Sequence, residues 1–129
     1  MRARSFDATE DGHLTQEMKD AYLQDGFLIL RGYKTTGECD ALKERMTALI
    51  DAFDPESIAS VFETGAQTHA QDSYFRESGD KVRFFFEQEA FDGDGKLIRN
   101  KHEALNKVGH ALHDEDPVFE AFTRDEKME

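Results

Sequence analysis

A capping box followed by a long helical repeat is the sequence feature that most restricts the fold of this chain. Thr35 and Glu38 have the spacing at which each side chain bonds the backbone amide of the other at a helix start. The apolar residues behind them recur at helical intervals, namely Leu42, Met46, Leu49, Ile50 and Phe53. The sequence therefore predicts a helix from Gly37 to Phe53.

The segment before this helix carries the signals of a shorter helix and a strand. Thr15 is a candidate N-cap for a helix through Asp25, and Gly26 is placed to end it. Four consecutive apolar residues, Phe27–Leu30, then predict a strand that is buried on both faces. Residues 1–13 mix charged and small polar groups without a period, so we expect a flexible tail there.

The second half of the chain contains the pattern of an antiparallel hairpin. The aromatic run Val82–Glu87 predicts a strand, Asp92–Gly95 a turn, and Lys96–Ile98 a short return strand. The stretch from Pro55 to Asp80 has weak periodicity and is expected to be mostly irregular, with a short strand at Ser60–Glu63. These elements predict an α+β fold, with helices and a small antiparallel sheet.

The C-terminal part of the sequence predicts two further helical elements. Leu105, Val108 and Leu112 line one face of a helix expected at Glu103–Asp114. Pro117 is suited to begin a last helical turn, because proline is favoured at the first position of a helix.

The charge balance excludes two classes of partner. The 129 residues include 28 acidic and 16 basic side chains, which gives a formal net charge of −12. This charge repels nucleic-acid phosphates and anionic lipid heads, so we expect neither nucleic acid nor membrane as a partner. Cys39 is the only cysteine, and the N-terminal segment lacks the apolar run of a secretory signal, so a cytoplasmic location is expected.

Two segments of the sequence, SGDKVRFFFEQEAFD and NKVGHALHDEDPVF, carry a more specific signal. An earlier segment, YLQDGFLILRGY, is a weak signal alone. Between Tyr22 and Thr123 the chain resembles the phytanoyl-CoA dioxygenase family, most of all the small-molecule dioxygenase-domain proteins without a clear acyl-CoA substrate. The resemblance implies that residues 14–129 are the N-terminal part of such a domain. That part is the helical cap and first strands of a double-stranded β-helix, or jelly-roll, whose barrel is incomplete in this chain.

The resemblance also implies an activity for the longer parent protein. Members of the family are Fe(II)- and 2-oxoglutarate-dependent dioxygenases, which here would hydroxylate a small organic substrate. They hold iron with a His-x-Asp pair and a second histidine, and no His-x-Asp occurs in this sequence. We therefore expect no metal ligand and no catalytic residue in this chain, which would be inactive alone. Iron and 2-oxoglutarate belong to the parent enzyme, and neither is expected to bind productively to the chain by itself.

Lys107 is the candidate cofactor-binding residue. By resemblance it corresponds to the family lysine that contacts a carboxylate of 2-oxoglutarate, and an ammonium on a flexible stem suits an anion. His110 and His113 are three residues apart and would be neighbours on the expected helix, so they are candidate substrate-pocket residues. The triplet from His113 to Glu115 fits a His-x-Glu pattern, but at a helix end, so we assign it no iron.

The alternative is a non-enzymatic module. Unsatisfied strand edges would let copies of the chain associate with one another. His110, His113 and nearby carboxylates would instead serve as a small metal-binding site.

Overall fold

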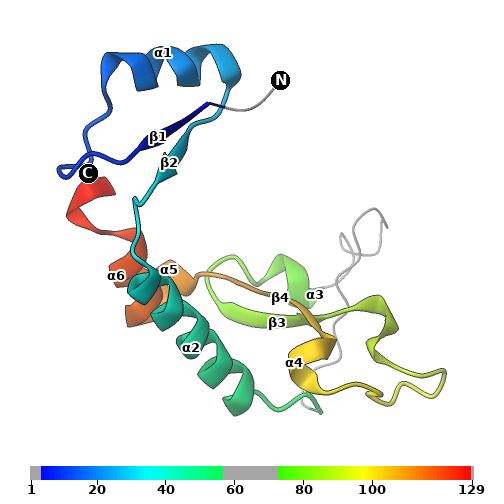
Figure 1. Cartoon of the computed structure of the whole chain (residues 1–129). Coiled ribbons are helices and arrows are strands. Elements are labelled where there is room, and N and C mark those ends of the chain that lie inside the picture. Colours follow the sequence, from blue (N-terminus) through cyan, green and yellow to red (C-terminus); the bar gives the residue numbers. More distant parts are fainter. Residues whose placement is uncertain (1–3, 57–72, 129) are drawn as a thin grey trace.

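The computed structural model describes residues 4–56 and 73–128 and shows a mixture of helices and two small sheets (Figure 1). In chain order the labelled elements are β1 (Ser5–Asp7), α1 (Gln16–Asp25), β2 (Ile29–Arg31), α2 (Thr36–Ala52), α3 (Ser73–Arg76), β3 (Val82–Phe86), α4 (Lys101–Ala104), β4 (Leu105–His110), α5 (Leu112–Glu115) and α6 (Pro117–Thr123). Short 3₁₀ helices, η2 (Gln88–Ala90) and η3 (Glu126–Met128), follow β3 and α6. The mixed helix and sheet content agrees with the predicted α+β class, whereas the jelly-roll remains a prediction. The strand predicted at Ser60–Glu63 lies outside the described residues.

Helix α1 begins and ends at the predicted residues. The Thr15 hydroxyl accepts a hydrogen bond from the Met18 amide at 3.3 Å. Gly26 has a φ of 77°, a left-handed conformation that favours glycine, and its N–H bonds the Tyr22 carbonyl at 2.8 Å. Both ends are set by local side-chain and backbone chemistry.

Strands β1 and β2 precede and follow α1 in the sequence and form a parallel pair. This pairing corrects two predictions. Residues 1–13, expected as a flexible tail, contain β1, and Asp7 accepts a hydrogen bond from the Arg31 side chain opposite it at 3.0 Å. The strand predicted at Phe27–Leu30 is displaced along the chain and is not buried on both faces, since Ile29 is 40% exposed. A strand pair held by backbone bonds at the surface needs no alternation of apolar residues, so no periodic pattern predicted it.

Helix α2 confirms the prediction of a capping box. Thr35 accepts a bond from the Glu38 amide at 3.2 Å, and the Glu38 carboxylate accepts one from the Thr35 amide at 2.8 Å. At the other end, Lys101 Nζ donates to the carbonyls of Asp51 at 2.6 Å and Phe53 at 3.1 Å. A cation at a helix C-terminus satisfies carbonyls that have no partner within the helix and complements the helix dipole.

The antiparallel pair of β3 and β4 forms the centre of the larger part of the molecule. Phe84 lies opposite Val108, and Phe85 lies opposite Lys107. Phe85 and Phe86 are fully buried. Phe86 packs in a core with Ala90, Ala104, Phe53, Phe91, Leu97 and Leu105. The predicted aromatic strand is therefore confirmed, and its side chains build this core.

The prediction of one continuous helix over Glu103–Asp114 is wrong, because its middle residues form a strand. Helix α4 ends at Ala104, and the chain then continues as strand β4 before the short helix α5. Asn106 and Gly109 are poor helix formers, and β3 offers a partner for backbone pairing, with a register shift between Phe85 and Phe86. Long-range pairing therefore outweighs the helical spacing of the apolar residues.

The predicted hairpin is half right. The Asp92–Gly95 turn is present: Gly95 donates its N–H to the Asp92 carbonyl at 3.0 Å and has a φ of 80°. The expected return strand Lys96–Ile98, however, contributes only a single bridge, between Phe91 and Leu97. The strand that pairs with β3 is β4 and not the predicted return strand.

Asp116 joins α6 to α2. It accepts hydrogen bonds from the amides of Val118 at 3.0 Å and Phe119 at 3.3 Å, and Arg45 Nε donates to it at 2.6 Å. The side chain is 3% exposed. Burial raises the pKa of Asp116, but the Arg45 guanidinium and the two amides outweigh it and hold this pKa below its ordinary value. Helix α6 begins at Pro117, as predicted.

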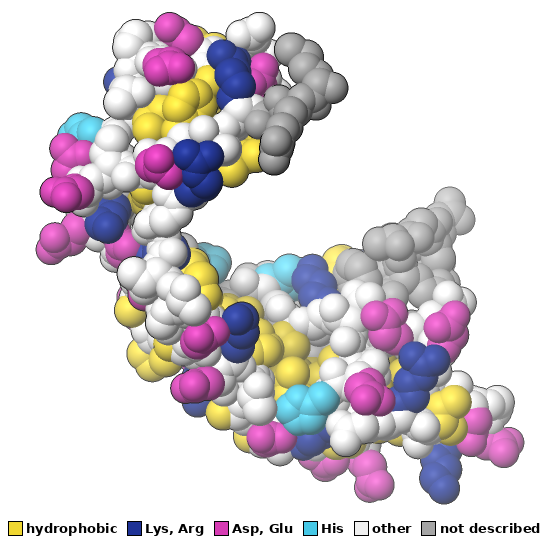
Figure 2. Space-filling view, in the orientation of Figure 1, with side chains coloured by type: hydrophobic (Ala, Val, Ile, Leu, Met, Phe, Trp, Pro, Cys, Tyr) yellow, Lys and Arg dark blue, Asp and Glu magenta, His cyan; other side chains and the backbone are white. Residues whose placement is uncertain are grey.

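The molecule is less compact than its mass implies. Figures 1 and 2 show the β1–α1–β2 unit set apart from the β3–β4 part, with α2 and α6 between them and a hollow on one side. The accessible surface is 9164 Å², whereas a compact monomer of this mass has about 6,900 Å². Large apolar side chains on the N-terminal unit lie exposed, among them Leu23 at 79%. None of the described helices is long and apolar enough to cross a bilayer.

Candidate functional site

Lys107 and His110 meet on strand β4. The Lys107 ammonium lies 2.7 Å from Nε2 of His110. Both side chains are half-buried, and Phe85, which lies opposite Lys107 in the sheet, is fully buried. The contact therefore lies on the strand pair that forms the core and not on a loop.

Ser78, which the sequence analysis did not single out, holds the other side of the imidazole. Its Oγ lies 2.8 Å from Nδ1 of His110 and 2.5 Å from the carbonyl oxygen of Phe75. Ser78 is fully buried. The serine and the lysine thus contact opposite nitrogens of one ring.

With Lys107 present as an ammonium, one arrangement of protons satisfies this chain of contacts. A carbonyl oxygen can only accept, so the Ser78 hydroxyl donates to Phe75 and accepts from Nδ1–H of His110. Nε2 is then the acceptor for the Lys107 ammonium, which can only donate. His110 is therefore neutral in this arrangement and carries its proton on Nδ1.

Aromatic rings enclose the histidine. The Phe75 ring meets the His110 ring edge to face, with centroids 5.7 Å apart, and the Phe85 ring lies 6.0 Å away. The Lys107 ammonium lies 5.8 Å from the Phe75 ring centroid. A surrounding of this kind keeps water away and strengthens the electrostatic contacts inside it.

Gly109 makes room for the lysine stem. A Cβ atom at this position would lie 3.3 Å from Cε of Lys107, tighter than an ordinary contact. Lys107 and Gly109 are two residues apart on a strand, so they share a face of the sheet. The missing side chain allows the Lys107 stem to run along the strand toward His110.

A shallow cavity of about 240 Å³ adjoins Lys107 between α2 and β4. Its lining is mainly apolar and comprises Met46, Ile50, His102, Leu105, Asn106, Lys107 and Val108. Arg83 does not reach this site, because its guanidinium stacks on the Tyr74 ring at 4.4 Å and donates to the Tyr74 carbonyl.

His113 lies apart from the pair formed by Lys107 and His110. Its ring is half exposed and pairs with Asp114 at 3.2 Å. The predicted neighbourhood of His110 and His113 depended on a continuous helix, and β4 ends between them. The structure thus brings Lys107 and His110 together and leaves His113 at the surface.

The described residues do not fit an iron centre. Across 4–56 and 73–128, no three His, Cys, Asp or Glu side chains lie where they would share a metal ion. Both ring nitrogens of His110 already have hydrogen-bond partners, one of them an ammonium that would repel a cation. The metal site suggested for His110, His113 and nearby carboxylates is therefore not supported. The carboxylate of 2-oxoglutarate, in contrast, suits the Lys107 ammonium.

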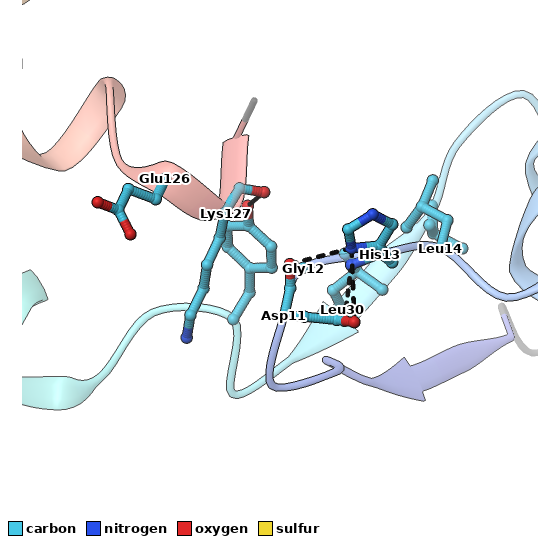
Figure 3. Close-up of a pocket in the computed structure, with 9 residues that line it drawn as sticks. Asp11, Gly12, His13, Leu14, Leu30, Glu126 and Lys127 are labelled. Carbon is cyan, nitrogen blue, oxygen red and sulfur yellow. Dashed lines mark hydrogen bonds and ion pairs between the residues drawn. The ribbon is translucent and has the colours of Figure 1, made fainter.

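A larger cavity of about 640 Å³ lies elsewhere, where the loop after β1 meets β2 and η3 (Figure 3). His13 lines it and donates its backbone N–H to the Asp11 carboxylate at 3.1 Å. This hydrogen bond holds the pKa of Asp11 below its ordinary value. Tyr33 also lines the cavity and donates its hydroxyl to the Lys127 carbonyl at 2.6 Å. None of the predicted site residues lines this cavity.

Comparisons with known proteins agree with the resemblance drawn from the sequence. The family model described as phytanoyl-CoA dioxygenase matches residues 22–128. A Dictyostelium discoideum phytanoyl-CoA dioxygenase domain-containing protein 1 homolog is 49% identical over 115 residues, which is 89% of this chain and 41% of that protein. An Arabidopsis thaliana phytanoyl-CoA dioxygenase is 42% identical, over 91% of this chain and 41% of its own length. The phytanoyl-CoA dioxygenase domain-containing protein 1 of Danio rerio is 39% identical, over 90% and 42%. The chain thus spans about two-fifths of the length of these curated relatives.

Proposed function

The chain belongs to the phytanoyl-CoA dioxygenase family, and on this premise we propose that it is the N-terminal part of an Fe(II)- and 2-oxoglutarate-dependent dioxygenase acting on a small organic substrate. In that protein Lys107 binds a carboxylate of 2-oxoglutarate. The observation that carries this role is the ammonium held 2.7 Å from a neutral imidazole on a core strand. When bound, iron and 2-oxoglutarate supply the oxidising chemistry, and this chain supplies the anchor for the cosubstrate.

The surroundings of Lys107 favour an anion over other ligands. The lysine is half-buried beside aromatic rings, where an ion pair is stronger than in water. The contact with the His110 ring orients the ammonium. An ammonium has three N–H donors, so a bond to His110 is compatible with a bond to a carboxylate.

Among the described residues no three His, Cys, Asp or Glu side chains lie where they would share a metal ion, and on this ground we propose that the 129-residue chain alone does not turn over 2-oxoglutarate. A test compares it with a chimera in which residues 22–128 replace the matching region of the Dictyostelium relative. With Fe(II) and 2-oxoglutarate present, we expect the chimera to form succinate and the chain alone to form none. Succinate formed by the purified chain, or a folded chimera without turnover, would contradict the proposal.

A second candidate function is self-association, which the exposed apolar side chains favour. Leu23 on α1 and Phe27 before β2 lie on the N-terminal unit, 79% and 49% exposed. Each described sheet has two strands, so each strand has an edge without a strand partner in the described part of the chain. Sedimentation over a range of concentrations should show a dimer that Leu23→Asp and Phe27→Asp abolish. A monomer at every concentration would exclude it.

A further inference from the structure

The family resemblance implies a role for Lys107, and the structure adds two residues that position it. His110 bonds Lys107 through Nε2, and Ser78 bonds His110 through Nδ1. We propose that Ser78 and His110 are positioning residues that hold the Lys107 ammonium ready for the 2-oxoglutarate carboxylate. This inference rests on the proposed function of Lys107. It gives His110 a role different from lining a substrate pocket.

The direction of the hydrogen bonds is the first support for this role. A neutral histidine exists in two tautomers, and only the form with its proton on Nδ1 accepts a bond from Lys107. Ser78 selects this form, because its hydroxyl donates to the Phe75 carbonyl and so offers Nδ1 an acceptor. Ser78 thus determines which nitrogen faces the lysine without contacting the lysine.

The rigidity of the arrangement is the second support. Ser78 is fully buried, and the rings of Phe75 and Phe85 pack against His110. The imidazole cannot rotate without breaking these contacts. A lysine side chain has four rotatable carbon–carbon bonds and high rotamer entropy, so fixing its end before the ligand arrives lowers the entropy cost of binding.

The test uses the isotope-labelled 129-residue chain and two NMR readouts that need no bound cofactor. Ring ¹⁵N shifts report the tautomer of His110, and ¹³C relaxation at Cε reports the picosecond-to-nanosecond order of the Lys107 side chain. In the parent chain we expect the Nδ1–H tautomer and a Lys107 end more ordered than that of the exposed Lys96.

Three substitutions separate positioning from a general structural effect. His110→Ala should lower the order of Lys107 toward that of Lys96. Ser78→Ala keeps the His110 imidazole, so His110 should become a mixture of tautomers and the end of Lys107 should become less ordered. This variant tests the positioning role even where His110→Ala fails to fold. His113→Ala is the matched control, because His113 pairs with Asp114 at the surface, and it should change neither readout.

Two outcomes overturn the proposal: a Lys107 end equally ordered with and without His110, or a His110 that carries its proton on Nε2 in the parent chain. Failure of the proposed function gives a different result. If Lys107→Ala in the chimera leaves the KM for 2-oxoglutarate unchanged, the anchor role fails while the NMR results stand. If both proposals hold, His110→Ala in the chimera raises this KM about tenfold, the equivalent of one hydrogen bond to a charged group, with kcat little changed.

Discussion

Ser78 Oγ lies 2.8 Å from Nδ1 of His110, although 32 residues separate the two in the chain. The contact connects the segment before β3 to the end of β4 and adds a side-chain bond to the backbone pairing of these strands. The contact also affects Lys107, because it leaves Nε2 of His110 to accept a hydrogen bond from the Lys107 ammonium. The geometry of Lys107 therefore depends on a buried serine that it does not contact.

Gly109→Ala is expected to shift the Lys107 side chain while changing the stability of the fold little. The new Cβ would lie 3.3 Å from Cε of Lys107, so the flexible stem must shift. Replacing glycine within a strand gains up to about 1 kcal/mol of backbone entropy, which offsets the crowding. We expect a nearly unchanged free energy of unfolding and a changed Lys107 Cε chemical shift. Gly93→Ala is the control, since nothing lies within 4 Å of its Cβ; equal shifts in both variants would contradict this account.

Asp116→Ala should destabilise the chain by about 2–4 kcal/mol, because it removes an N-cap and the buried partner of a half-buried ion pair. Asp116→Asn should cost less, since asparagine also caps helices but lacks the charge that pairs with Arg45. Urea unfolding measures both. Asp80→Ala serves as the control, because the Asp80 side chain is 84% exposed. Equal effects of the substitutions at Asp116 and Asp80 would show that Asp116 does not join α6 to α2.

The contribution of Asp116 should depend on pH. Its pKa is lower in the folded protein than its ordinary value of 3.8, because the bonds from Arg45 and two amides outweigh burial. A group of this kind stabilises the fold above its unfolded pKa, and the stabilisation is lost as the pH falls through the folded pKa. The stability difference between the parent chain and Asp116→Asn should therefore be full near pH 7 and shrink below pH 3.8. A difference that grew on acidification would refute this assignment.

Lys101→Met should destabilise α2 from its C-terminal end. Two carbonyls, those of Asp51 and Phe53, lose a charged donor, with an expected cost of about 1–2 kcal/mol at this half-exposed site. Lys43→Met is the matched control within α2 itself, because Lys43 is 76% exposed and pairs with Asp40 at 2.9 Å on the helix surface. We expect its effect to stay within about 0.5 kcal/mol. Thermal unfolding followed by circular dichroism distinguishes the two.

Local chemistry made part of this fold predictable. Thr15 and Gly26 bound α1, and Thr35 with Glu38 begins α2, because each of these signals acts within four residues of the chain. The aromatic content of β3 was equally visible in the sequence. The role of Lys107 came from family resemblance and not from its local sequence.

The rest depends on contacts between distant segments. Leu105 and Val108 are spaced as on a helix, and only the presence of β3 turns this segment into a strand. The same change separates His113 from His110, so the prediction that these two histidines are neighbours on one helix is wrong. The contact between Ser78 and His110 could not be predicted, because no periodic pattern in the sequence connects residues so far apart. Its burial and its bond to His110 appear only in the folded chain.

The most direct test of the central claim is the KM for 2-oxoglutarate of the Lys107→Ala chimera. The account predicts a rise of about tenfold or more, since an ammonium that binds a carboxylate is lost. Lys96→Ala, which removes an exposed lysine near the Asp92–Gly95 turn, should leave this KM unchanged. An unchanged KM in the Lys107→Ala chimera, with succinate formation intact, would contradict the claim that Lys107 binds the cosubstrate.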